Sequence, residues 1–555
     1  MDNYQIADMF SLLAKLMDIH GENSFKSKSY ANAAFQLEKV VQQVAEMQLQ
    51  QIAQLKGIGD SAAKKIEEIL ATGELKVLSD LIEKTPPGIL EMLNIKGLGP
   101  KKIQTVWKEM EIESIGELLY ACNENRLTLF KGFGEKSQQN IKETIEFYLR
   151  NQGSFLYAQT EKIAGHLLAQ LQLIIAPSKI FSTGQVAMHN DTIDVIHFVT
   201  DSNVEKIIAG LDKNGMKYEL KNDASIGFKL EEGSKISIDF VDEKMLMQTV
   251  FERNCGSDFL EAFSKKYTVE SINNFLSEEA YFASLPLPYL PAYLRNDASI
   301  IELAVQNKMP RIIETSDIKG IIHSHSNWSD GSFSIEQMAS AAIAQGFEYL
   351  VISDHSKSAF YANGLQEDRI KAQHQQIEEL NSKLAPFRIF KSIESDILND
   401  GSLDYSDDIL STFDLVIASV HSNLKMTEEK AMQRLITAIE NPFTTILGHM
   451  TGRLLLSRKG YPVDHKTIID ACVANNVVIE LNAHPRRLDI DWSWIRYATE
   501  KGALISIDPD AHSIDGYDDI RYGVIAAQKG LLTAAQNLSS FSLAEFERFL
   551  INRRK

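Results

Sequence analysis

Two histidines close the apolar segment "GIIHSHSNWSDG", and their spacing suggests a metal site. His323 and His325 follow a β-branched run, and Asp330 comes five residues after the second histidine. Side chains two residues apart point to the same side of an extended strand, so the two imidazoles converge if the strand persists to its end. Neutral imidazoles beside a carboxylate suit a divalent metal ion, and burying them without such a partner is costly. For this pair alone, a surface histidine pair in a loop would be the better explanation.

The same arrangement recurs along the rest of the chain. Apolar, β-rich runs alternate with helical patterns such as "SIEQMASAAIAQGF" and "HKTIIDACVANN", which predicts a parallel (β/α) barrel. Functional residues of such barrels lie at the carboxyl ends of the strands. Several histidines gathered at one end therefore predict a multinuclear metal site. The runs end in His323 with His325, His355, Glu394, His421, His449, His484, and Asp510 with His512.

Residues 316–555 resemble the PHP (polymerase and histidinol phosphatase) domain, in the form that is fused behind bacterial and archaeal family X DNA polymerases. The segments "DHSKS", "ANGL", "ILGHMTGRLL" and "DAHSIDGYDDIRYGV" carry the resemblance. It implies a distorted (β/α)7 barrel that holds two or three divalent metal ions, and mixed imidazole and carboxylate ligands suit zinc or manganese best. The ligands that the resemblance implies are His323, His325, Asp330, His355, Glu394, His421, His449, Asp510 and His512.

Five residues are candidates for a direct part in catalysis at this site. Glu394 or another carboxylate is expected to bridge two metal ions, and Asp330 or Asp510 to serve also as the proton donor to a leaving group. The choice between these two aspartates stays open. Arg453 and Lys357 are either phosphate clamps beside the site or ordinary loop cations.

Three Gly-apolar-Gly turns in the first 150 residues each enter a helix and have lysines nearby. The glycines allow a close backbone approach, and the amides at the helix start form an anion site. Repetition at similar spacing favours the helix-hairpin-helix, which grips DNA phosphates without reading bases. The residues expected to contact DNA are Gly57, Gly59, Lys64, Lys65, Gly97, Gly99, Lys101, Lys102, Gly132 and Gly134.

The segment "GENSFKSKSYANAAFQLE" resembles the N-terminal domain of family X DNA polymerases, and residues 151–300 resemble their nucleotidyltransferase core. Lys65 matches the lysine that forms a Schiff base in the lyase members, although a phosphate contact explains it better. In the core, Gln185 replaces a triphosphate-binding serine, and both following arginines are absent. Thr192 replaces the first of three metal-binding aspartates, whereas Asp194 and Asp239 remain. Nucleotidyl transfer needs carboxylates to hold the metal ions and cations to hold the triphosphate. Because this core lacks members of each set, we expect a degenerate polymerase site.

The chain of 555 residues is therefore expected to be multidomain. Its net charge is −18, but residues 1–150 carry 18 Lys and Arg against 21 Asp and Glu, so the acidic excess lies in the later parts. Three scattered cysteines and the lack of a long apolar run predict a cytoplasmic, nucleoid-associated protein with no membrane partner. The predicted parts are an N-terminal helical domain (1–85), a fingers-like helix-hairpin-helix region (86–150), a degenerate palm and thumb (151–300) and the PHP domain (316–555).

Together these features predict a DNA-binding, metal-dependent phosphoesterase that acts in DNA repair. It would be a 3′–5′ exonuclease, with abasic-site endonuclease or 3′-phosphatase as further activities, acting on gaps, nicks or 3′ ends without sequence specificity. One alternative is an active family X polymerase with a PHP editing domain, and the lost core residues weigh against it. A second is a small-molecule phosphatase of the histidinol-phosphatase type, against which the three turns weigh. A non-catalytic scaffold would not need a complete ligand set.

Overall fold

The computed structural model describes residues 1–37, 40, 42–95, 97–150, 153–213, 215–222, 224–230 and 233–553. The chain forms two compact units, Met1–Tyr148 (unit 1) and Leu149–Lys555 (unit 2). The domain boundary predicted between residues 150 and 151 falls beside residues 151 and 152, which lie outside the described residues. Among the described helices, none combines the length and apolar character needed to span a membrane.

Unit 1 is all-helical, as predicted. Its long first helix packs against the second, and its buried face includes Phe10, Leu13 and Leu16. The amphipathic helices that follow bury Ile66 and Ile103. The helices are α1 (Asn3–His20), α2 (Ser24–Leu37), α3 (Leu49–Ala53), α4 (Asp60–Thr72), α5 (Lys76–Glu83), α6 (Pro87–Met92), α7 (Pro100–Lys108), α8 (Ile115–Asn123) and α9 (Glu135–Arg150).

The first part of unit 2 is the predicted α/β palm, a five-stranded sheet in the order β2-β4-β7-β6-β5. Only β4 and β7 pair in parallel among these strands. Two helices, α10 and α11, pack on the sheet through an apolar cluster that includes Phe198 and Ile238. The elements are β1 (Phe155–Leu156), α10 (Tyr157–Ile175), β2 (Ile180–Thr183), β3 (Thr192–Ile193), β4 (Ile196–Thr200), α11 (Val204–Lys213), β5 (Tyr218–Asn222), β6 (Ser225–Lys229) and β7 (Lys235–Phe240).

An aromatic-rich helical segment follows the palm sheet and surrounds one buried ion pair. Arg295 is 0% exposed; its guanidinium donates two hydrogen bonds to Glu278, of 2.9 and 2.7 Å, and a third to the Leu290 carbonyl oxygen. The rings of Phe251 and Phe282 lie against the guanidinium. The helices are α12 (Leu246–Arg253), α13 (Ser257–Ser264), α14 (Glu278–Ala283) and α15 (Ser299–Val305).

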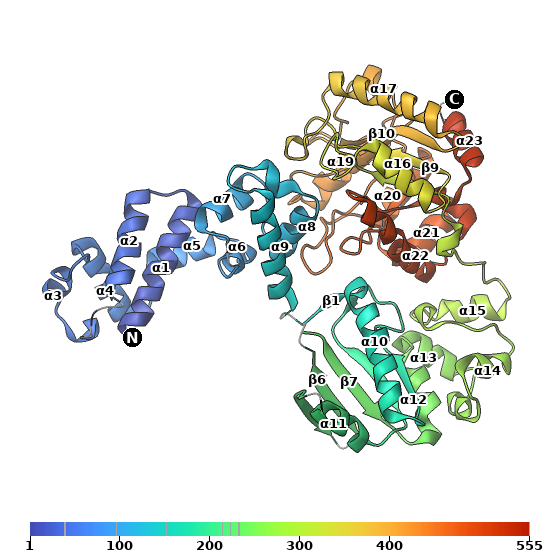
Figure 1. Cartoon of the computed structure of the whole chain (residues 1–555), viewed down its shortest axis with the longest axis horizontal. Helices are drawn as coiled ribbons and strands as arrows, with labels where there is room; N and C mark the ends of the chain where they lie inside the picture. Colours follow the sequence, from blue (N-terminus) through green and yellow to red (C-terminus); the bar gives the residue numbers. More distant parts are fainter. Residues whose placement is uncertain are drawn as a thin grey trace. The chain divides into compact units, whose positions relative to one another are not determined.

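The second part of unit 2 is a barrel of seven parallel strands in sequence order, which confirms the predicted fold class. A bridge between Ser324 and Ala511 joins the first strand to the segment after the last. Helices lie outside the strands (Figure 1). The strands are β8 (Gly320–Ser324), β9 (Tyr349–Ile352), β10 (Arg388–Asp396), β11 (Leu415–Ser419), β12 (Ile446–Leu447), β13 (Val478–Asn482) and β14 (Ile505–Asp508). The helices are α16 (Ile335–Ala344), α17 (Glu367–Leu384), α18 (Asp407–Leu410), α19 (Glu428–Ile439), α20 (His465–Ala474), α21 (Ile495–Glu500), α22 (Ile520–Lys529) and α23 (Leu543–Arg553).

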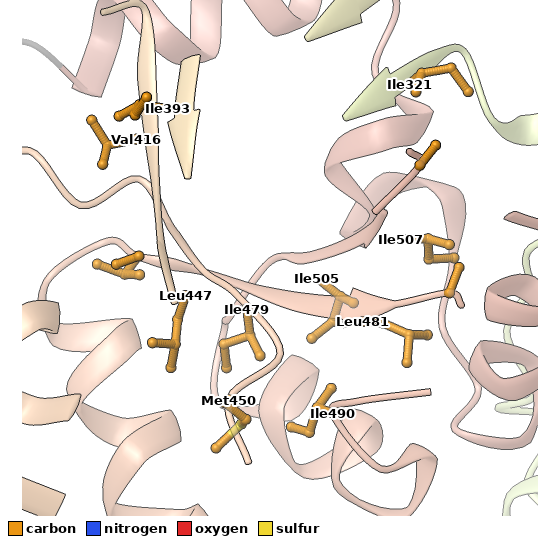
Figure 2. Packing of buried hydrophobic residues seen from close by; sticks show 14 of the residues in the cluster. Ile321, Ile393, Val416, Leu447, Met450, Ile479, Leu481, Ile490, Ile505 and Ile507 are labelled. Carbon is orange, nitrogen blue, oxygen red and sulfur yellow. The ribbon is translucent and has the colours of Figure 1, made fainter. Parts of the chain in front are cut away.

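The two faces of the barrel strands bury different apolar clusters. Side chains such as Ile393, Ile479 and Ile505 pack with the surrounding helices (Figure 2). Alternate residues on the same strands, such as Phe390, point to the barrel interior and join Phe546 of α23 in a second cluster. This second cluster forms an apolar floor to the interior. Buried serines follow it toward the carboxyl ends of the strands: Ser324, Ser353, Ser392, Ser419 and Ser506.

Charged contacts join the palm to the barrel within unit 2. Asp191 lies one residue out of register with the palm's metal-binding positions, and its carboxylate instead accepts from Arg453, at 3.5 Å, and from Lys529, at 3.3 Å. Lys529 also donates to the His189 carbonyl oxygen, and its side chain is 3% exposed. Asp191 thus binds two cations of the barrel, Arg453 and Lys529, from a position directly before β3 that is not one of the expected metal-binding positions of the polymerase site.

The buried pair between Glu278 and Arg295 should dominate the stability of the α12–α15 segment. Replacing Glu278 with alanine leaves a buried guanidinium without its carboxylate, and we expect the local free energy of unfolding to fall by about 3–5 kcal/mol. Hydrogen exchange of residues 257–305 in denaturant measures it. The matched control is Glu261→Ala, which removes a solvent-exposed pair with Lys265 and should leave the stability nearly unchanged. Equal effects of the two substitutions would contradict this assignment.

A candidate metal centre at the carboxyl ends of the barrel strands

Glu394, on β10, lies at the centre of a ring of histidines. Its carboxylate is 1% exposed and its oxygens lie between 3.0 and 3.6 Å from nitrogens of five imidazoles. Burial alone would raise the pKa of Glu394, but the imidazoles around it hold that pKa well below its usual range. A buried, ionised carboxylate shared by several imidazoles is suited to bridge metal ions. The five are His323, His325, His355, His421 and His449.

The predicted ligands cluster in three overlapping groups whose potential ligand atoms lie within 4.8 Å of one another. Asp330, in the loop after β8, lies in one group with three histidines, and Asp510, in the loop after β14, lies in another with two. His449 lies outside these groups but contacts Glu394 through its Nε2 at 3.1 Å. The structure therefore brings all nine predicted side chains to one end of the barrel. The groups are His325, Asp330, His355 and His512; His323, His325 and Asp510; and His355, Glu394 and His421.

The histidine pair reaches the site by a backbone distortion that the strand pattern did not predict. Ile321 packs on the helix side of β8 and Ile322 in the interior, so a regular strand would direct His323 toward the helices. Instead, the register with β9 shifts between Ile321 and Ser324, and His323 has a φ of 58°. Such a bulge re-aims a side chain, and positive φ at a non-glycine residue is costly. Strand β8 ends at Ser324, so the condition of a persistent strand, on which the sequence argument for convergence rested, is not met.

Two carboxylates that sequence reasoning missed fix the orientation of ligand histidines. Glu480, on β13, lies 2.6 Å from Nδ1 of His323 and accepts from the His449 amide at 3.1 Å. Asp396, at the end of β10, hydrogen-bonds Nδ1 of His421. Such contacts set which ring nitrogen is left to face a metal ion. The available signal was an acidic residue inside an apolar run, in "VVIELN" and "IESDI".

The site fits metal ions because buried ligand atoms have no hydrogen-bond partner among the described residues. Unsatisfied buried polar atoms are rare in proteins because each costs free energy. His323 Nε2 faces the carboxylates of Glu394 and Asp510 at 3.3 and 3.4 Å, where a divalent cation would satisfy several of these groups at once. The atoms are His323 Nε2, His325 Nδ1, Asp330 Oδ2, Glu394 Oε2 and His449 Nδ1.

The two aspartates of the cluster are better suited to hold metal ions than to donate a proton. Burial would raise the pKa of Asp330 and of Asp510, but the histidines beside each hold it below its usual range. Both carboxyl groups are therefore ionised at neutral pH. His325 has the opposite character, because burial and its neighbours His512 and His355 lower its pKa to about 3. A neutral imidazole is the form that binds metal.

The contacts of Arg453 favour the second of its two expected roles, that of a loop cation, over that of a phosphate clamp. Its guanidinium donates to Asp491 at 2.5 Å, to the carbonyl oxygens of Arg487 and Leu488, and to Asp191 of the palm. These contacts commit it to holding the loop after β13 in place. The guanidinium is held there because several hydrogen-bond acceptors surround it, two carboxylates and two carbonyl oxygens. The sequence could not reveal that these acceptors lie together.

Two other cations lie nearer the site. Arg487, which follows β13 in "AHPRR", has its Nε 3.7 Å from Asp510 and a side chain that is 7% exposed. Lys357 follows His355, lies 3.9 Å from Glu367 and remains about one-third exposed. Sequence reasoning missed Arg487, although two arginines directly after a strand-end histidine were a usable signal.

The three Gly-apolar-Gly turns of unit 1 have the backbone that an anion site needs. Their first glycines have φ of 79°, 94° and 97°, which only glycine adopts readily. The middle residues are buried, and each turn leads directly into α4, α7 or α9. Lys64 and Lys101 are exposed on the first turns of their helices. The glycines are Gly57, Gly97 and Gly132, and the buried residues are Ile58, Leu98 and Phe133.

The remaining lysines of these turns make local contacts. Lys102 donates to Ser137 at 2.7 Å and lies 5.4 Å over the Phe133 ring, so it joins the second turn to the helix after the third. Lys65 is paired with Glu68 at 2.5 Å. Both contacts involve partly exposed groups and leave room for a phosphate to compete for the cation.

The retained palm carboxylates are occupied by protein groups. Asp194 accepts from Ser154 at 2.6 Å and from the Gln185 side chain at 3.2 Å. Asp239 forms an ion pair with Arg253, and Thr192 offers no carboxylate. Gln185, which stands where the resemblance places a triphosphate-binding serine, thus donates a hydrogen bond to Asp194, one of the two remaining aspartates.

Comparison with known proteins matches each part of this description. Residues 1–75 match a helix-hairpin-helix domain, residues 89–146 a SAM-like helix-hairpin-helix tandem, and residues 322–484 a PHP domain. Probable phosphatases of Acetivibrio thermocellus and Syntrophotalea carbinolica are 29% and 26% identical, over 29% and 30% of this chain and 64% and 68% of theirs. The DNA polymerase/3′-5′ exonuclease PolX of Bacillus subtilis is 32% identical over 99% of both chains. This chain belongs to the PolX family, the family X DNA polymerases with a C-terminal PHP domain.

Proposed function

We propose that this protein is a metal-dependent 3′–5′ exonuclease acting on DNA ends, whose polymerase activity has been lost. The observation that carries the proposal is Glu394 within reach of five imidazoles, four of them buried, where candidate ligand atoms lack hydrogen-bond partners among the described residues. The name of the Bacillus subtilis relative, DNA polymerase/3′-5′ exonuclease, supports the same reaction. Zinc or manganese suits the ligand set best.

Different residues around the site would hold the metal ions, orient the imidazoles and attract the substrate phosphate. Divalent metal ions held there would act as Lewis acids on the phosphodiester and on a water molecule. Glu480 and Asp396 hold His323 and His421 in the tautomer that metal binding needs. Arg487 lies beside the ligand Asp510 and is placed to attract a substrate phosphate.

The turns of unit 1 favour DNA over a small phosphate ester as the substrate. The histidinol-phosphatase type of reaction needs only the barrel, whereas this chain adds three anion-binding turns with exposed lysines. Backbone amides and lysines contact phosphates of any sequence. We therefore propose gapped, nicked or 3′-recessed DNA, bound without sequence preference, as the substrate class in DNA repair.

Replacing His323 with alanine should abolish cleavage of a 3′-recessed duplex and lower the bound metal content. The imidazole is a proposed metal ligand, so its loss removes a metal ion rather than only destabilising the fold. Elemental analysis, a nuclease assay and thermal unfolding are measured together. The matched control is His166→Ala, an exposed histidine on α10, which should leave all three unchanged. Full metal content and activity in the His323 variant would exclude this site.

The palm should not extend a primer. With Mg²⁺ or Mn²⁺ and all four nucleotides, we expect the 3′-recessed primer to be shortened and never lengthened, because Thr192 offers no carboxylate and protein groups occupy Asp194 and Asp239. Gel analysis of a 5′-labelled primer measures both directions at once. Template-dependent extension that disappears in Asp194→Ala would show an active polymerase instead.

The turns of unit 1 should supply most of the salt-sensitive DNA affinity. In the full chain, the test replaces Lys64, Lys101 and Lys136, an exposed lysine of α9 directly after the third turn, with alanine. Each is expected to contact a phosphate, so the slope of log affinity against log salt should become shallower by about 2–3. Fluorescence anisotropy with duplexes of two unrelated sequences measures this. The control replaces three exposed lysines of the palm, Lys213, Lys217 and Lys266, with the same change in net charge. An equal effect of both triple substitutions would place the DNA elsewhere.

A further inference from the structure

A short loop beside the metal centre, residues 356–365, is closed on itself by backbone contacts. The Leu365 amide donates to the carbonyl oxygen of His355, a predicted metal ligand, at 2.9 Å, and the Gly364 amide donates to Ala359 at 3.1 Å. A Cβ atom at Gly364 would overlap the Ser356 carbonyl oxygen. The two ends of the loop are therefore in direct contact at the end of β9.

Side-chain contacts tie the same loop to two neighbouring segments that carry metal ligands. Ser358 donates to Asp396 at 2.8 Å, and Asp396 in turn hydrogen-bonds the ligand His421. Arg369 donates to the Asn363 carbonyl oxygen at 2.7 Å and to that of Trp328, two residues before the ligand Asp330. The position of the loop is thus fixed relative to the ligands.

Among the side chains of this loop that the structure describes, three aliphatic ones are buried and the ring of Phe360 is exposed. Ala359, Ala362 and Leu365 are each 0% exposed, whereas Phe360 is 75% exposed. A single exposed apolar residue is ordinary on a protein surface. This one is distinguished by its place at the tip of an anchored loop, three residues after Lys357, which remains about one-third exposed.

We propose that Phe360 stacks on the nucleobase at the DNA end whose phosphodiester enters the metal centre. A flat ring on a fixed loop offers a stacking surface to any base, and a lysine on the same loop attracts the backbone, the pairing by which proteins hold single-stranded DNA without sequence preference. The proposal rests on the exonuclease function proposed above and names Phe360 as a determinant of nucleic-acid over small-ester specificity.

The test compares Phe360→Ala, Phe360→Leu and Phe360→Trp in the full chain. The first probe is an oligonucleotide with a 3′-terminal 2-aminopurine, bound to protein in chelator so that no cleavage occurs. Stacking quenches its fluorescence, so we expect quenching with wild type and Phe360→Trp, and its loss in the alanine and leucine variants. Leucine keeps apolar bulk without a ring, and Leu276→Ala, an 85% exposed apolar residue of the palm and thumb part, should behave as wild type.

The second measurement is the ratio of kcat/KM for a 3′-overhang DNA to kcat/KM for bis(p-nitrophenyl) phosphate, which has no nucleobase. We expect this ratio to fall about tenfold in the alanine and leucine variants and to recover with tryptophan. The proposal would be overturned if the alanine and leucine variants quenched 2-aminopurine as wild type does and kept the wild-type ratio of kcat/KM values. Equal losses on both substrates with a lower Tm would also overturn it, because they would show a structural role. If wild type does not cut DNA at all, the exonuclease proposal fails, while the quenching still decides whether Phe360 binds a base.

Discussion

The barrel depends on one constraint, the burial of a carboxylate among imidazoles with no water to solvate them. Glu394 is 1% exposed and has five histidines within 3.6 Å. Burying charged and polar groups is tolerable only where each gains a partner. Seven parallel strands meet this need, because their carboxyl ends converge and each brings its side chains to the same space. The apolar floor beneath, with Phe390 and Phe546, keeps water out from the other end.

Further contacts around this cluster hold its histidines in position. Glu480 and Asp396 fix two of the histidines, and the bulge at His323 turns its ring from the helix side to the interior. The palm contributes as well, because Asp191 holds Arg453, which holds the carbonyl oxygens of the loop that carries Arg487. A palm whose retained carboxylates are occupied by protein groups therefore still supports one wall of the barrel site.

The sequence predicted the parts of the site that follow from strand periodicity and failed where local backbone or tertiary contacts decide. The position of a strand-end side chain such as His421 could be predicted, because β11 is regular and its interior positions alternate down to that residue. The path of His323 could not, since the sequence pattern shows no bulge. Glu480 was missed because an acid inside an apolar strand becomes meaningful only when the facing histidine is known. The sequence left two roles open for Arg453, and it could not choose between them because the partners of its guanidinium come from segments far apart in the chain.

The carboxylates of the palm and those of the barrel differ in how far protein groups satisfy them. In the palm, Asp194 has Ser154 and Gln185 as donors, and Asp239 has Arg253, so neither carboxylate gains much from a metal ion. In the barrel, buried atoms of Glu394 and His323 have no hydrogen-bond partner among the described residues. An unsatisfied buried group costs about 1–3 kcal/mol, a cost that persists only where a ligand offsets it. Metal binding should consequently stabilise the barrel against unfolding and leave the palm unaffected, because linkage acts only on the part that binds.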